Sequence, residues 1–169
     1  MSDEIINKVA ESGLITIDLE KYLSKREDVA VFDLKDFLFM GMILKEKDFR
    51  EALKQYDWEE YRNKNVAISC TADAIIPVWA YMLVTTYLQP FAKSTMVGDI
   101  NELQKAITMK NIASINTEDL LDKRIVIKGC GDTPIDNYMY AEATRVLLPV
   151  AKSIMYGEPC STVPVFKKK

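Results

Sequence analysis

The chain has 169 residues, of which 49% are hydrophobic and 28% charged, as in an ordinary soluble globular protein. Its net charge of −3, with residues 167–169 as the only run of basic side chains, argues against a surface that binds nucleic acid. Residues 1–4 are acidic and unlike a secretory signal, and the most apolar segment, residues 74–88, is too short to cross a membrane. We therefore expect a single cytoplasmic domain over residues 1–169.

Two features of the composition narrow the chemistry that the chain can perform. Histidine is absent, which removes the commonest general base and the commonest metal ligand. Three cysteines in a reducing compartment are more typical of thiols or metal ligands than of a disulfide framework. Any proton transfer by this chain must therefore use carboxylates, lysine, tyrosine, cysteine or a metal-bound water.

The first third of the chain predicts strands between short helices. Residues 2–13 indicate a helix that ends at a glycine, and the alternation of apolar and polar side chains over residues 14–19 indicates a half-buried strand. Residues 29–34 predict a second strand, whereas residues 37–44 are apolar enough for either a strand or a helix. Apolar side chains at helical spacing predict an exposed helix over residues 46–56.

The rest of the chain contains an internal repeat. Residues 58–99 recur as residues 117–158, so that Pro90 corresponds to Pro149 and Gly98 to Gly157. Each copy has a β-branched strand, a helix with proline in its first turn, a proline near the helix end, and a second short strand. The pattern predicts one supersecondary unit that is used twice.

The repeat predicts an α/β fold in which duplicated strand-helix-strand units surround a mostly parallel or mixed sheet with flanking helices. Residues 100–109 are expected to form a further amphipathic helix between the two copies. Residues 161–166 predict a last strand, and Pro164 within it indicates an edge position.

The three cysteines are candidate metal ligands. Cys70, Cys130 and Cys160 each follow a predicted strand, and the carboxyl ends of parallel strands meet at one edge of a sheet. Three thiolates at one point suit zinc or an iron–sulfur cluster, with Asp73 and Glu158 as the favoured oxygen ligands. Two other interpretations stay open: plain buried thiols, since cysteine behaves as a small hydrophobe, and a redox or persulfide-carrying thiol.

The loop before the second repeat helix is a candidate anion site. Gly129 and Gly131 leave backbone N–H groups that can hold a phosphate or carboxylate, together with Thr133 and the side chain of Lys128. The pattern matches neither a P-loop nor a dinucleotide fingerprint, and glycines in a tight turn often have only a conformational role. In this reading Asp73 or Glu158 would supply acid–base chemistry, so the question of catalysis stays open.

Several segments resemble a known protein family. They are residues 5–15, residues 70–82, Val126 to Cys130, and residues 157–165. On these motifs the chain is similar to an uncharacterised bacterial family, domain of unknown function 2480, over nearly its whole length. The resemblance implies a cytoplasmic bacterial protein whose gene can lie beside those for iron–sulfur cluster assembly, and it implies no established activity.

These observations lead to two main functional hypotheses. The first is an accessory protein that binds zinc or an iron–sulfur cluster through Cys70, Cys130 and Cys160. The alternative is an interaction module, with inert buried cysteines, in which the two apolar repeat helices exceed what one sheet can cover and form a homodimer face. A further protein partner is compatible with either hypothesis.

Overall fold

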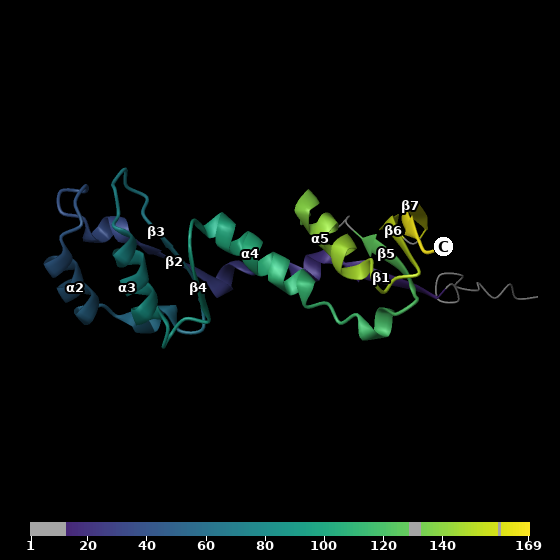
Figure 1. The fold of residues 1–169 in the computed structure, drawn as a ribbon, viewed down its shortest axis with the longest axis horizontal. Helices are drawn as coiled ribbons and strands as arrows, with labels where there is room; N and C mark the ends of the chain where they lie inside the picture. The colour runs from purple at the N-terminus through teal and green to yellow at the C-terminus, as the bar shows by residue number, and fades with distance from the viewer. Residues whose placement is uncertain (1–12, 129–132, 159) are drawn as a thin grey trace, which may run out of the picture. The chain divides into compact units, whose positions relative to one another are not determined.

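The chain divides into two compact units, which we describe separately (Figure 1). The structure is a computed structural model, and it describes residues 13–128, 133–158 and 160–169. Unit 2 is the continuous segment Ser24–Ala106, and unit 1 consists of the flanking segments Met1–Leu23 and Ile107–Lys169. Unit 2 is thus inserted into the sequence of unit 1.

Unit 2 is a three-stranded parallel sheet with two crossover helices. Its elements in chain order are the 3-10 turn η2 (Arg26–Asp28), β2 (Val29–Asp33), the 3-10 turn η3 (Leu34–Phe37), α2 (Glu46–Gln55), the 3-10 turn η4 (Trp58–Tyr61), β3 (Asn65–Ser69), α3 (Val78–Leu88) and β4 (Ser94–Val97). The strand order is β2-β3-β4, so both crossovers move in the same direction along the sheet. Right-handed crossovers of that kind place both helices on the same face.

Unit 1 repeats this plan and adds one strand. Its elements are β1 (Leu14–Asp18), the 3-10 turn η1 (Leu19–Tyr22), the end of α4 (Ile100–Ala113), the 3-10 turn η5 (Glu118–Leu120), β5 (Arg124–Lys128), α5 (Asn137–Leu147), β6 (Ser153–Glu158) and β7 (Ser161–Lys167). The strand order is β1-β5-β6-β7, and β7 pairs antiparallel with β6 at the edge. Helix α4 begins in unit 2 and ends in unit 1.

The predicted α/β class, with mostly parallel pairing and flanking helices, is confirmed. The strands form two sheets, however, where the sequence suggested that both repeat copies share one. Residues 37–44, which the sequence left open, form a turn closed by a bridge between Phe39 and Ile43. The helix expected over residues 2–13 lies outside the described residues, apart from Gly13. Among the described residues, no helix has the length and hydropathy that a membrane span requires.

The two units follow the same backbone path. Asn63 N donates to Phe91 O at 3.0 Å in unit 2, and Asp122 N donates to Val150 O at 2.8 Å at the same point of unit 1. Both donors have positive φ angles, 62° for Asn63 and 56° for Asp122. The similarity extends to the first strands, because β1 and β2 both end in an aspartate that caps the following 3-10 turn.

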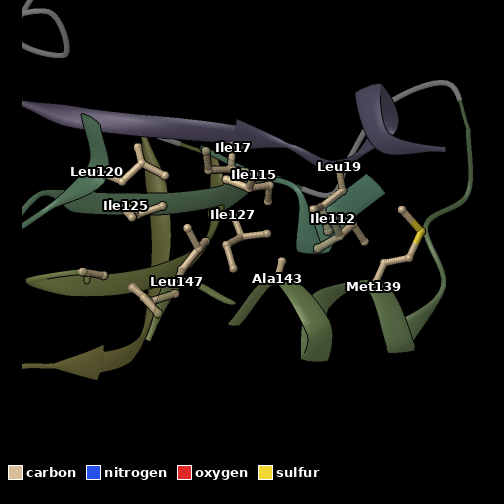
Figure 2. Close-up of a cluster of buried hydrophobic side chains, with 12 residues drawn as sticks. Ile17, Leu19, Ile112, Ile115, Leu120, Ile125, Ile127, Met139, Ala143 and Leu147 are labelled. Atoms are coloured by element: carbon tan, nitrogen blue, oxygen red, sulfur yellow. The ribbon is translucent and has the colours of Figure 1, made fainter. Parts of the chain in front are cut away.

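One apolar core fills each unit between the sheet and its helices. In unit 2, Phe32 of β2 stacks on Trp58 with ring centroids 5.4 Å apart, within a cluster that includes side chains of both α2 and α3. In unit 1, Ile17, Ile125 and Ile154 from three strands pack against α5 and the end of α4. Figure 2 shows this core, with Ala143 and Leu147 of α5 facing the strands.

Replacement of Phe32 by Ala is expected to destabilise the protein by about 3–5 kcal/mol, because Phe32 is 1% exposed and the cavity would not refill. Both tryptophans, Trp58 and Trp79, lie in unit 2, so tryptophan fluorescence during urea unfolding reports directly on that unit. The midpoint of the fluorescence transition should move to lower urea.

The matched variant in unit 1 is Ile17→Ala, since Ile17 also precedes the final aspartate of a first strand. We expect it to destabilise the protein by about 2–4 kcal/mol and to shift the same tryptophan transition, because α4 is continuous through both units. A tryptophan transition that does not move in Ile17→Ala would contradict cooperative unfolding of the whole chain as one domain.

Candidate functional site

Asp33, the last residue of β2, holds the loop that follows β3. Thr71 donates to it twice, from its amide N to Oδ1 at 3.0 Å and from Oγ1 to Oδ2 at 2.6 Å. Lys35 N donates to Oδ1 at 3.0 Å, and Lys35 Nζ lies 3.3 Å from Oδ2. Burial raises the pKa of Asp33, but these donors outweigh it and hold the pKa below its ordinary value. Asp33 is therefore an ionised structural anchor at the carboxyl edge of the sheet.

The corresponding edge of unit 1 also uses carboxylates as anchors. Asp18 Oδ1 accepts a hydrogen bond from Glu20 N at 3.2 Å, and Glu20 Oε1 accepts one from Thr133 N at 3.2 Å. The Thr133 amide, which the sequence placed in an anion site, thus donates to a carboxylate of the chain itself. Lys128 ends β5, whereas Gly129 and Gly131 lie outside the described residues, so the anion site stays a prediction.

The predicted cysteine cluster is wrong. Within the described part of the chain, no group of three or more histidine, cysteine, aspartate or glutamate side chains could hold a metal ion. The reason is the division into two sheets, because Cys70 follows a strand of unit 2 and Cys160 follows a strand of unit 1. Cys130 lies outside the described residues. The accessory function in zinc or iron–sulfur binding therefore loses its structural basis.

The remaining predicted site residues are also distributed over the two units. Asp73 lies in the loop before α3 of unit 2, and Glu158 ends β6 of unit 1. The alternative of inert buried cysteines needs correction as well. Cys70 is only half-buried, with Sγ donating to Ala72 O at 3.7 Å, and Cys160 is exposed.

The most unusual surface of the described residues is the outer face of α3. The chain from Ala74 to Ala92 contains no Asp, Glu, Lys or Arg, although one side of the helix faces solvent. Val78 and Met82 lie four residues apart on that side and are 75% and 65% exposed, and Ile75, in the loop just before the helix, is 93% exposed. A helix that is apolar on all sides is normally covered on all sides. This outer face therefore has the character of an interface.

Unit 1 shows that the fold does not require large apolar side chains on the outer face of this helix. The equivalent helix, α5, presents Asn137, Ala141 and Arg145 where α3 presents Val78, Met82 and Thr86. Both helices nevertheless pack similar inner faces against similar sheets. The comparison of α3 with α5 thus indicates that the apolar side chains on the outer face of α3 are not required for folding.

Some of these features carried a signal in the sequence. The pattern Ile17-Asp18-Leu19 recurs as Phe32-Asp33-Leu34 after each first strand, and it would have identified the two anchoring aspartates. The two copies of this pattern are close together in sequence because unit 2 is inserted directly after the first one. The spacing therefore differs from that of the main repeat.

Comparison with known proteins identifies the family. A family model described as a protein of unknown function (DUF2480) matches residues 3–168, so the chain belongs to that family. Neither the curated proteins nor the solved structures gave a match to the chain.

Replacement of Thr71 by Val should raise the pKa of Asp33 and destabilise the protein by about 1–2 kcal/mol at neutral pH, because a hydrogen bond to an ionised carboxylate is lost. A carboxyl group with a lowered folded pKa contributes stability above its unfolded pKa and loses it as the pH falls through the folded pKa. Urea unfolding between pH 7 and pH 3 should therefore show the difference from wild type shrinking at acidic pH.

Thr144→Val provides the control for this experiment. Thr144 Oγ1 donates to the backbone carbonyl of Tyr140, a neutral group, so its loss should have an effect that does not vary with pH. An effect of Thr71→Val that is equally independent of pH would contradict the assignment of Asp33 as an ionised anchor.

Proposed function

We propose that this member of the DUF2480 family is a protein-interaction module that forms a homodimer through the outer face of α3 in unit 2. The observation that supports the proposal is the uncharged, exposed row of Val78 and Met82 on α3 with Ile75 just before the helix. The counterpart helix in unit 1 has no large apolar side chain at the positions matching Val78 and Met82, where it carries Asn137 and Ala141. Large exposed apolar patches with a polar rim are typical of association surfaces.

The free energy gained by burying these apolar side chains is large enough to offset the entropic cost of association. Burial of a large apolar side chain is worth roughly 1.5–3 kcal/mol, so three such residues from each of two copies supply about 9–18 kcal/mol. Loss of translational and rotational freedom on association costs about 4–15 kcal/mol. A weak to moderate dimer is therefore the expected outcome, and the loss of two residues from each copy should be enough to dissociate it.

A second copy suits this surface because the row is self-complementary. In a two-fold dimer the same patch is present on both sides, and an uncharged row meets itself without repulsion between like charges. The rim is also compatible with its own copy. Helix α2, which contacts α3 through Phe49 and Trp79, carries both signs of charge in equal number on its exposed positions. These positions are Glu46, Lys47, Asp48, Arg50, Glu51 and Lys54.

The test uses the residues that unit 1 itself carries. In the double variant Val78→Asn, Met82→Ala, the outer face of α3 becomes like that of α5, so folding should be preserved. We expect wild-type protein to be a dimer by size-exclusion chromatography with light scattering, and the double variant to be a monomer with an unchanged far-ultraviolet spectrum.

Leu121→Asn is the matched control, because Leu121 is a large apolar residue that is 65% exposed and belongs to unit 1, whereas the proposed interface belongs to unit 2. This variant should keep the wild-type mass. The dissociation constant of a moderate dimer is on the order of 10 μM. A wild-type protein that is monomeric at about this concentration would contradict the proposal. So would a double variant that remains dimeric.

A further inference from the structure

A second surface of unit 2 differs from the face of α3 in shape and charge. The turn Phe39 to Ile43, which we call the methionine loop, connects η3 to α2 and follows the carboxyl end of β2 (Figure 1). Phe39 N donates to Ile43 O at 2.8 Å, and Ile43 N donates to Phe39 O at 3.1 Å. Backbone hydrogen bonds thus close the loop on itself.

The side chains of the methionine loop are apolar and point outward. Met40 is 78% exposed and Met42 61% exposed, with Gly41 between them. Met40 has a φ angle of 52°, a conformation for which turns normally select glycine or asparagine. A methionine at this position has an energetic cost, and methionine side chains adapt to irregular apolar surfaces.

A hollow of about 260 Å³ lies beside the loop. Its lining includes the apolar residues Phe37, Phe49 and Ala52, of which Phe49 is 1% exposed, and the acidic residues Asp36 and Asp48. Lys45 also lines the hollow. Its Nζ atom lies 3.2 Å from the centre of the Phe39 ring and forms a cation–π contact with it. Within the described part of the chain, neither Asp36 nor Asp48 forms an ion pair.

We propose that the methionine loop and this hollow together bind a segment of a protein partner that combines large apolar side chains with an arginine or lysine. The apolar side chains would contact Met40, Met42 and Ile43. The stem of the basic side chain would lie on Phe37, and its charged end would reach Asp36 and Asp48. This surface extends the interaction function beyond self-association and uses residues outside the face of α3.

The charges around the loop favour a protein over a lipid surface. Lys35 is paired with Asp33, and Asp36 and Asp48 outnumber Lys45 in the lining of the hollow, whereas binding to anionic lipid needs an excess of basic residues. The loop also lacks the tryptophan and tyrosine that typically sit at membrane interfaces. Strand addition is excluded as the binding mode of the loop, because the amide groups of Phe39, Met42 and Ile43 donate within the turn.

The test uses two synthetic amphipathic peptides that are identical in their leucines and differ only in one central residue, Arg in one and Glu in the other. Titration of each fluorescently labelled peptide with the full chain should give at least about tenfold tighter binding of the Arg peptide. The double variant Asp36→Asn, Asp48→Asn should abolish this preference. The double variant Met40→Ser, Met42→Ser should weaken binding of the Arg peptide.

Glu27→Gln, an exposed carboxylate of η2, is the control and should retain the full preference. Equal affinity for the two peptides, no binding of either, or a preference that survives Asp36→Asn, Asp48→Asn would overturn the proposal. Binding to phosphatidylglycerol vesicles that is lost in Met40→Ser, Met42→Ser would overturn it in favour of a membrane surface. The oligomeric mass of these variants should equal that of wild type, which separates this result from the test of the homodimer.

Discussion

The arrangement of unit 2 depends on the handedness of its two crossovers. Because the strand order β2-β3-β4 follows the chain, both connections turn the same way and bring α2 and α3 to one face of the sheet. The core between them is filled by an aromatic cluster around Phe32 and Trp58. The inner face of α3 is thereby buried, and its outer face has no further layer of unit 2 to cover it. The exposure of Val78 and Met82 follows directly from this topology.

The duplication provides an internal standard for interpreting the surface. Two units with the same path, the same anchoring aspartates and similar cores differ in the outer face of one helix. They differ also in the connection from the first strand to the first helix. In unit 2 this connection contains the short methionine loop, whereas in unit 1 the whole of unit 2 is inserted there. Features common to both units serve the fold. Features found only in unit 2, the apolar face of α3 and the methionine loop, are the ones that we assign to interactions.

Much of the fold could be predicted from the sequence, because local patterns determine it. The β-branched runs at Val66 and Ile125 and the prolines at the helix ends marked strands and helices that the structure contains. The sequence could not show whether two copies of a unit join one sheet or form two, since strand pairing depends on the partners of β1 and β2. Strand β1 pairs with β5 and strand β2 pairs with β3, and the length of chain between the paired strands differs in the two cases.

The error in the candidate site has the same origin. Cys70 and Cys160 were brought together on the assumption of a single sheet edge, and two sheets place them in separate units. The surface that we propose for interaction was easier to foresee, because the absence of charged residues between Ala74 and Ala92 is visible in the sequence. The exposure of the outer side of α3 was not visible in the sequence, since periodicity cannot show whether an apolar helix is buried on both sides or only on one.

The most direct measurement of the central claim is the rate at which peroxide oxidises Met82 as the protein concentration is raised. If α3 forms the interface between two copies, the rate should fall severalfold from dilute to concentrated protein, while Met40 keeps a constant rate. Met139, which is fully buried in unit 1, serves as the slow reference. A rate of Met82 oxidation that is the same at every concentration would contradict the account.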